Sequence, residues 1–396
     1  MKATDRRLFS ALYCLVFIAI FADFIANEQP ILCKIDDTWY APVLHQYSVD
    51  LGINEWEARF VNTPWQEQDY QFCWMPPIPY SAFTQDFKNS RYVGPFEPQN
   101  IPTWRYRHWL GTDQIGRDVL AGMVSGTRTA LLVGLVAMGI AASIGIMLGA
   151  MAGYFGDHRL KISWLEGLFL LVGNTLGFFY AFVGRAHLLS EHFLIESLKS
   201  VGLYVTLAVA SYVLGSYLTS ILHLRKHIYF PMDSLVLRLI ELLRSIPAIL
   251  ILLAVLGLIK TPSILYIVLI IGLLSWTGIA RFVRSELLRI RQLDYIHAAR
   301  AVGLSEARIL WHHALPNALP PVSITIAFGI AATILVEASL SFLGIGVAPD
   351  VVTWGTMLKN AYQQISAWWI GFFPGLAIFC TVFLFNLLGE HLSQNR

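Results

Sequence analysis

Eight long apolar stretches are the feature that most limits how this chain can fold. They cover residues 8–26, 129–154, 162–183, 193–222, 235–260, 263–282, 322–347 and 368–388. Each is close to the roughly 20 residues that a helix needs to cross a bilayer. Composition agrees, because 56% of the residues are hydrophobic and only 14% are charged. The sequence therefore predicts an all-α polytopic membrane protein, not a soluble domain.

Basic residues around these stretches set the predicted orientation. Lys2, Arg6 and Arg7 precede the first stretch, and arginines and histidines cluster between residues 281 and 313. Positive charge of this kind marks cytoplasmic segments, so both termini are predicted to be cytoplasmic. The first stretch fits either a signal peptide or a retained helix, and we favour a retained helix.

Residues 27–118 differ from the rest of the chain. They are rich in proline, tryptophan and tyrosine and show no sustained helical or strand period. We expect an extracytoplasmic module that lies against the membrane through aromatics such as Trp104, Tyr106 and Trp109. A disordered linker is the alternative, although so many aromatics argue against it. Cys33 and Cys73 lie in this segment, and outside the cytoplasm they either pair or remain two free thiols.

Two of the apolar stretches, within residues 158–230, are separated by a short link. The link, residues 185–192, holds one arginine, whereas residues 223–227 are basic, which predicts that the link lies outside and the basic segment inside. A single re-entrant hairpin is the alternative. Glu166 and Asn174 lie within the first of these stretches, and we expect them to pair between helices.

Three features of the core stretches predict local geometry. Gly145, Gly149 and Gly153 recur every four residues, which predicts close helix packing on that face. Pro247 should kink the span over residues 235–260. Glu337 lies inside an apolar stretch, which is costly unless the carboxylate is paired or wet, so it faces either a pore or a neighbouring helix.

A polar segment, residues 294–317, has the pattern of a rigid helical hairpin between two apolar stretches. The pattern predicts one helix over Asp294–Val302, a break at Gly303, and a second helix that Ser305 caps and that ends before Pro316. A rigid hairpin at the cytoplasmic face can pass force to a protein docked beneath the membrane. An ordinary basic loop is the alternative.

Several of these strings resemble the permease subunits of bacterial dipeptide, oligopeptide and nickel-type ABC importers, the DppC/OppC-like family. Ala298-Ala299, Gly303 and Leu315-Pro316 have the spacing of the family's EAA loop. The string RHWLGTDQIGRDVL, residues 107–120, resembles the HWLGTD-x-x-GRD signature. Residues 237–252 and 335–346 also resemble family helices. The resemblance covers most of the chain outside residues 27–103 and 158–230.

This resemblance implies the type I permease fold of ABC importers, with six family helices and two inserted spans. It divides the chain into an N-terminal transmembrane helix (1–26), the extracytoplasmic module (27–118), a second helix (119–157), the inserted pair (158–230) and a permease core (231–396) with a coupling loop at 286–317. It also implies a multi-pass protein of the bacterial inner membrane. The implied partners are a second permease subunit, two cytoplasmic ATP-binding subunits and an extracytoplasmic solute-binding protein.

The same motifs supply the predicted site residues. The ATPase-coupling loop comprises His297, Ala298, Ala299, Gly303, Leu315 and Pro316. The family often has glutamate where this chain has His297, so no glutamate-specific contact is expected. The extracytoplasmic signature comprises Gly111, Thr112, Asp113, Gly116, Arg117 and Asp118. Its glycines allow tight turns, and its charged residues are expected to form a local network.

The sequence gives no sign of catalysis. Glycine is never followed by lysine, so there is no Walker A loop, and no GxSxG, HExxH or EF-hand string occurs. We therefore expect no enzyme activity, no catalytic residue, no bound cofactor or metal and no nucleic acid. ATP and Mg²⁺ are expected on the partner ATPases.

Two other functions stay open at this point. One is an ion-coupled secondary transporter that uses Glu337 or Glu166 as its ion site, and the other is a membrane scaffold or receptor that does not transport. The solute of an importer is equally open between a dipeptide, a longer peptide, a peptide antibiotic, a nickel chelate and a sugar.

Overall fold

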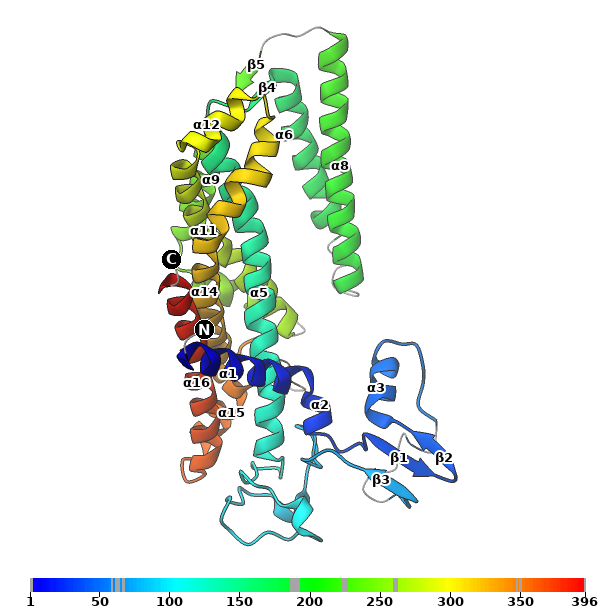
Figure 1. Ribbon diagram of the computed structural model, residues 1–396. Coiled ribbons are helices and arrows are strands. Elements are labelled where there is room, and N and C mark those ends of the chain that lie inside the picture. Colours follow the sequence, from blue (N-terminus) through cyan, green and yellow to red (C-terminus); the bar gives the residue numbers. More distant parts are fainter. Residues whose placement is uncertain are drawn as a thin grey trace.

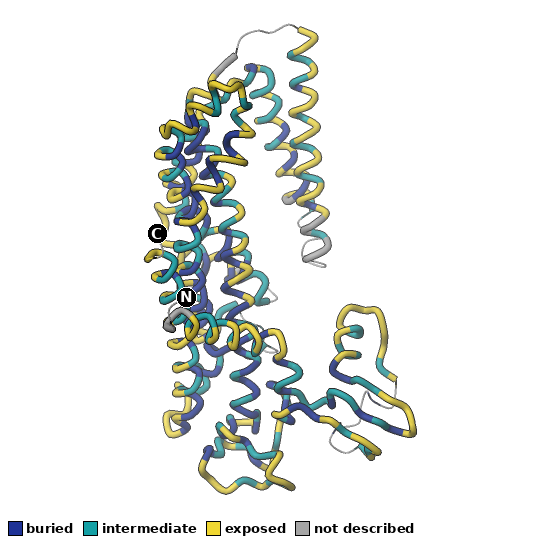
Figure 2. The backbone as a smooth tube through the Cα atoms, viewed as in Figure 1, coloured by how far each residue is buried: buried dark blue, intermediate teal, exposed yellow. Residues whose placement is uncertain are grey.

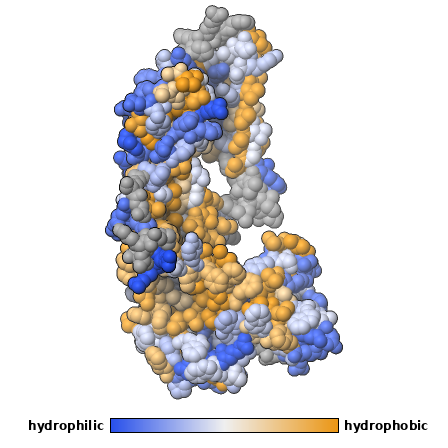
Figure 3. Space-filling view, viewed as in Figure 1, coloured by the Kyte–Doolittle hydropathy of each residue, from blue (hydrophilic) through white to orange (hydrophobic). Residues whose placement is uncertain are grey.

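Long helices run side by side in one elongated bundle (Figure 1). The computed structural model describes residues 3–57, 60, 65, 68–185, 193–222, 227–258, 263–346, 348 and 351–394. Within these residues, six helices are long and apolar enough to cross a membrane, or seven if one bent pair counts as a single span. This confirms the predicted all-α polytopic fold. An apolar middle separates the two more polar ends of the bundle (Figure 3).

Helix α5 (Val119–Phe155) is the central element. Asp118 caps its first turn, where its Oδ1 accepts a hydrogen bond of 2.6 Å from the Ala121 amide. The cap explains why the helix begins ten residues before the predicted apolar stretch. Helix α11 (Ile264–Ile290) packs closely along it, because a Cβ at Gly149 would lie 2.5 Å from the Ala280 carbonyl oxygen. The predicted close-packing face is thus confirmed.

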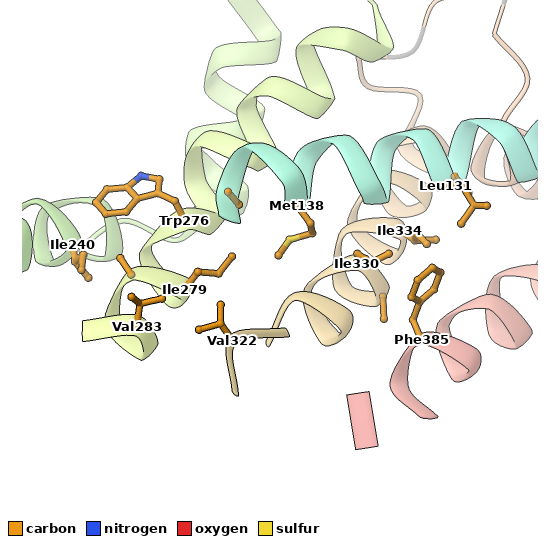
Figure 4. Packing of buried hydrophobic residues seen from close by; sticks show 14 of the residues in the cluster. Leu131, Met138, Ile240, Trp276, Ile279, Val283, Val322, Ile330, Ile334 and Phe385 are labelled. Carbon is orange, nitrogen blue, oxygen red and sulfur yellow. The ribbon is translucent and has the colours of Figure 1, made fainter. Parts of the chain in front are cut away.

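The core lies where α5 and α11 meet helix α14 (Leu315–Leu343) and helix α16 (Trp368–Gln394). Figure 4 shows Met138, Ile279, Ile330 and Phe385 from these four helices converging on one apolar cluster. Helix α15 (Trp354–Gln363) lies between α14 and α16 in the chain. Its Trp354 is buried and donates a hydrogen bond of 3.1 Å to the Met123 carbonyl of α5.

The predicted kink at Pro247 is confirmed and is sharper than a bend in one span. Helix α9 (Met232–Arg244) and helix α10 (Ala248–Leu258) meet at 72°. Proline lacks an amide hydrogen and clashes with the preceding turn, which explains the break at this position. Arg284 of α11 fixes α9 by donating to both carboxylate oxygens of Asp233, with one contact of 2.7 Å.

The N-terminal helix α1 (Ala3–Ile20) is not among the candidate spans, since its 18 residues include Asp5, Arg6 and Arg7. It crosses the bundle obliquely and continues into α2 (Ala22–Ile25) (Figure 1). The ring of Phe9 meets His391 near the end of α16, and the Ala19 carbonyl accepts a hydrogen bond of 3.1 Å from Arg128 of α5. The helix therefore links these two elements, and its crossing of the membrane remains a prediction.

The module between α2 and α5 contains short regular elements, which the sequence did not predict. Strands β1 (Leu32–Ile35), β2 (Thr38–Tyr40) and β3 (Phe72–Trp74) form an antiparallel sheet in the order β2-β1-β3. Helix α3 (Pro42–Asp50) lies between β2 and β3 in the chain, and the 3₁₀ turns η2 (Phe87–Asn89) and η3 (Trp104–Tyr106) follow β3. Such short strands are stabilised by packing, not by local pattern. Trp65 and Phe60 stack at 5.1 Å beneath this sheet.

The inserted segment forms a helical hairpin that stands beside the bundle (Figure 1). Helix α6 (Trp164–Phe178) continues through a π turn, η4 (Phe179–Val183), and packs against α8 (Phe193–Ile221). Strands β4 (Lys161–Ser163) and β5 (His227–Tyr229) join its two ends. Most of the α8 surface is exposed (Figure 2). The predicted links at 186–192 and 223–226 lie outside the described residues.

The two polar residues of the inserted hairpin, Asn174 and Glu166, have partners of different kinds. Asn174 accepts a hydrogen bond of 2.6 Å from the Tyr204 hydroxyl of α8, so the predicted pairing between helices is confirmed. Within the described residues, Glu166 has no partner on another helix; its Oε2 accepts a hydrogen bond of 2.8 Å from the Ser163 amide at the start of α6. A carboxylate in the first turn satisfies an otherwise unpaired amide, which is the physical reason for this correction.

Candidate functional site

The predicted hairpin at residues 294–317 begins with helix α12 (Asp294–Ala301) and a defined turn. The amide of Leu304 donates to the Ala299 carbonyl at 3.2 Å, and that of Gly303 to the Arg300 carbonyl at 2.9 Å. This is the Schellman arrangement, which needs a left-handed residue directly after the helix. Gly303 supplies it with φ +86°, so the predicted break at Gly303 is confirmed.

The second part of the hairpin differs from the prediction. Ser305 caps helix α13 (Glu306–Ile309) as expected, with its side chain accepting from the Arg308 amide at 3.4 Å. The helix does not end before Pro316, however, but continues through the π turn η5 (Leu310–Ala314) into α14. The π turn changes the hydrogen-bonding pattern directly before Leu315-Pro316, so the missing proline amide does not end the helix there. The hairpin and α14 are therefore one continuous element.

A buried apolar side holds the hairpin against the bundle. Ile296, Ile309 and Leu310 are at most 1% exposed and join the same cluster as Ile240 and Leu287. Burying side chains of this size contributes roughly 1.5–3 kcal/mol each. The hairpin is therefore packed as firmly as the core and cannot move independently of it.

A polar clamp ties the hairpin to the inner end of α5. Tyr154, which is fully buried, donates a hydrogen bond of 2.5 Å to Glu306 of α13. Arg300 of α12 donates to the other Glu306 oxygen at 2.9 Å and to the Tyr154 hydroxyl at 3.4 Å. Arg159 lies 4.0 Å from Glu306, and both guanidinium groups lie 5.8 Å from the centre of the Tyr154 ring. The clamp joins both arms of the hairpin to α5 through one carboxylate.

None of the clamp residues was predicted from the sequence. The only signal was the basic character of the segment, which does not say which arginine finds a carboxylate. Arg300 and Glu306 lie six residues apart on two different helices, so their meeting depends on the turn at Gly303.

The opposite side of the hairpin is exposed. Of the six predicted coupling residues, His297, Ala298, Gly303 and Pro316 are exposed, Ala299 is partly buried, and Leu315 is buried in the core. Val302 is 82% exposed, and Tyr295 and Trp311 also show large exposed surfaces. Large apolar side chains left exposed on a polar segment are typical of a protein-binding surface. We call the surface formed by Tyr295, Val302 and Trp311 the hairpin face.

The second predicted site, the signature at residues 111–118, is built around a histidine that the prediction did not include. His108 is fully buried between two carboxylates, with its Nδ1 2.8 Å from Asp118 and its Nε2 3.3 Å from Asp86. Tyr80 stacks on its ring at 4.4 Å. Burial alone would lower the pKa of His108, but the hydrogen bonds and charge of Asp118 and then of Asp86 outweigh it and raise that pKa.

The expected network among Asp113, Arg117 and Asp118 forms only in part, because the charge of Arg117 acts on Asp113 whereas Asp118 binds other groups. Asp118 binds His108 and caps α5, as described above, whereas Asp113 Oδ1 accepts the amides of Ile115 and Arg117 at 2.9 Å. Burial raises the pKa of Asp113, partly offset by these amides. In the described part of the chain, no ion pair joins the three residues. Short carboxylates serve nearby backbone amides more readily than a long arginine side chain, which explains the difference.

The remaining signature residues fix the outer end of the bundle. Gly111 and Gly116 have φ +79° and +84°, and a Cβ at Gly116 would lie 2.1 Å from the Asp86 carbonyl oxygen. Thr112 donates to the Asn89 carbonyl at 2.7 Å and accepts through its own carbonyl a hydrogen bond of 3.1 Å from Trp369 of α16. The predicted tight turns at both glycines are confirmed, and they dock the module onto α16.

Glu337 of α14 is 1% exposed and accepts hydrogen bonds from the hydroxyls of Ser341, at 2.5 Å, and Thr353. Of the two arrangements left open by the sequence, this geometry fits the buried and paired one. It also removes the main argument for an ion site at this residue, since both partners are neutral hydroxyls within the protein.

Part of the chain is similar to a known family of proteins. Residues 211–396, from the end of α8 to the C-terminus, match the family described as binding-protein-dependent transport system inner membrane component. Over these residues, which are just under half of the chain, it is similar to members of that family. The match confirms the type I permease fold of ABC transporters and a multi-pass protein of the inner membrane, as the sequence predicted.

The chain is also similar in sequence to individual transport proteins. A putative peptide transport system permease protein of Brucella suis is 36% identical over 198 residues, which is 49% of this chain and 65% of that protein. The chain thus covers less than two thirds of that relative. The inner membrane ABC transporter permease protein YejE of Escherichia coli is 26% identical over 404 aligned positions, covering 98% of this chain and 92% of the relative. The dipeptide transport system permease protein DppC of Bacillus subtilis is 27% identical over 298 residues, covering 75% and 70%.

Proposed function

We propose that this inner membrane component forms half of the translocation pore of an ATP-driven importer for peptides or similar small solutes. The observation that carries the proposal is the hairpin face. It lies on a hairpin that is clamped to α5, continuous with α14 and exposed at the end of the bundle opposite the outer signature. The names of the relatives, which include peptide and dipeptide transport, support the solute class.

The geometry supports a mechanism in which force enters at the hairpin face. A cytoplasmic ATPase that grips this face and moves it must also move α14, because α13 runs into α14 without a loop. The clamp carries the same motion to α5. Packed helices shift as units and do not deform gradually. Movement at the inner end is therefore delivered to the outer ends of both helices.

The proposal includes the partners that the resemblance implies. A second permease subunit completes the pore, two ATP-binding subunits bind ATP and Mg²⁺, and an extracytoplasmic solute-binding protein delivers the solute. The proposal also takes both termini to be cytoplasmic, and the basic residues at the N-terminus support this. Glu166 caps α6 and Glu337 is internally paired, so no observation favours an ion-coupled transporter over this function.

A charge on the hairpin face tests the proposal. Val302→Asp alters a side chain that is 82% exposed, so the chain should still fold and insert. Burying the new carboxylate against an ATPase without a partner is costly. We expect ATP-binding subunits to be lost from the purified complex, and uptake of an alanine tripeptide to fall to background.

Ile365→Asp is the matched control, since Ile365 is 85% exposed but lies between α15 and α16 at the other end of the bundle. It should leave ATPase association unchanged. If Val302→Asp retained both its ATP-binding subunits and wild-type uptake, the hairpin face would not be the coupling surface.

A further inference from the structure

A pocket of about 430 Å³ lies between the signature and the outer ends of α5, α14, α15 and α16. Four charged side chains line it: Asp113, Arg117, Asp118 and Lys359. The amides of Asn360 and Gln363 lie at the same wall. None of the interactions that hold the hairpin involves this pocket, so it needs its own account.

The two acids of the pocket are already engaged by the protein. Asp118 binds His108, at 2.8 Å, and the Ala121 amide. His108 lies behind the wall and is shared between Asp118 and Asp86. Asp113 Oδ1 is held by two backbone amides. Neither carboxylate is therefore available to neutralise the two bases completely.

The two bases lack such partners. Arg117 Nε is buried and has no hydrogen-bond partner among the described residues, an arrangement that proteins rarely tolerate. Neither Arg117 nor Lys359 forms an ion pair within the part of the chain that the structure describes. Lys359 Nζ lies over Gly344, 2.3 Å from where a Cβ would be, so the glycine makes room for it at the C-terminal end of α14. That helix end attracts the ammonium but offers only a partial charge.

We propose that this outer pocket binds a carboxylate of the transported solute, with Arg117 and Lys359 as its ligands and the amides of Asn360 and Gln363 as further donors. A guanidinium presents donors in a fork that matches a carboxylate. The pocket therefore holds two bases whose hydrogen-bonding capacity its two acids do not meet, which suits a ligand with a carboxylate. The identification of the ligand as the transported solute rests on the proposed import function, whereas the binding of a carboxylate does not.

Charge-selective labelling tests the pocket without transport. Asn360→Cys is placed in a full-length chain whose four native cysteines are replaced by serine, in membrane vesicles open to the outer side. The rates with an anionic sulfonate and a cationic trimethylammonium methanethiosulfonate are compared. Removing one positive charge about 8 Å from the thiol in water lowers the ratio of the anionic to the cationic rate by about fivefold. Arg117→Gln should therefore lower this ratio by about fivefold, and Arg117→Lys should preserve it.

Protection then identifies the ligand. N-acetyl-alanyl-alanyl-alanine, which has one carboxylate, should slow labelling of the Asn360→Cys thiol when the rest of the pocket is unchanged, and its C-terminal amide should not. The protection should disappear when Arg117→Gln is added. Equal protection by acid and amide, or a labelling ratio that Arg117→Gln leaves unchanged, would overturn the proposal. The proposal would also be overturned if protection appeared only in the Asp350→Asn variant. In that case the carboxylate of Asp350, which lies outside the described residues, would be the group that binds the two bases.

These results separate the two proposals. Labelling and protection require no ATP hydrolysis and no partner subunit, so a failure here leaves the function of the hairpin face standing. Conversely, a harmless Val302→Asp would refute the coupling surface and leave a carboxylate pocket intact.

Discussion

The turn at Gly303 allows a prediction in which backbone strain is the only variable. Gly303 has φ +86°, and no atom lies within 4 Å of where its Cβ would be. A substitution therefore meets no neighbour, and its whole cost comes from holding an L-residue in the left-handed region. That cost is about 1–2 kcal/mol for most residues and less for asparagine. β-Branched residues are the least tolerant of positive φ.

The expected order of hairpin stability is thus Gly303, then Gly303→Asn, Gly303→Ala and Gly303→Val. A loss of about 1 kcal/mol raises the fraction of open turns roughly fivefold. Hydrogen exchange reports this directly, since the amides of Gly303 and Leu304 are the two that close the Schellman turn. In detergent-solubilised protein, alanine should accelerate their exchange about fivefold and valine more.

Gly139→Ala is the matched control. A Cβ at Gly139 also meets no atom within 4 Å, but its φ is not positive, and it lies inside α5. Alanine there should be neutral or slightly stabilising, because it lowers the entropy of the unfolded chain. Equal exchange in glycine, alanine and valine variants at position 303, or an asparagine variant worse than valine, would refute the reasoning.

Three further predictions concern the clamp, the signature and the module. Tyr154→Phe should lower the free energy of unfolding by about 1 kcal/mol, as thermal denaturation would measure. The loss is smaller than for a fully buried hydrogen bond to a charged group, because Glu306 is 42% exposed. His108→Gln should cost about 3 kcal/mol, since it leaves two carboxylates without their buried cation. Because the folded pKa of His108 is raised above 6.5, its stabilisation is complete below that pH and is lost as pH rises through the folded value; the variant should not show this loss. Cys33 and Cys73 face each other across β1 and β3 as free thiols, the second of the two arrangements that the sequence left open. Burial, and then the nearby Cys73, raises the pKa of Cys33 to about 11, so oxidation should form a disulfide slowly, as mass spectrometry of oxidised protein would show.

The sequence by itself determined the elements whose signals are local. Apolar length fixed the spans from α5 to α16, the four-residue glycine spacing fixed the face between α5 and α11, and Gly303 and Ser305 fixed the turn of the hairpin. These features depend on backbone geometry and hydrophobicity within a few residues. Local signals failed at Pro316, because whether a proline ends a helix or begins one depends on the residues before it.

Only the tertiary structure decided which charged groups meet. His108 lies 22 residues from Asp86, and Tyr154 lies 152 residues from Glu306, yet each pair forms one hydrogen bond. No spacing rule connects such residues, since their meeting depends on how the signature turns and how α12 folds back over α5. The same holds for the outer pocket, whose two bases come from the start of α5 and from α15. Local sequence decides whether a segment forms a helix or a turn, whereas packing between distant segments decides which charged side chains remain unpaired and can bind a ligand.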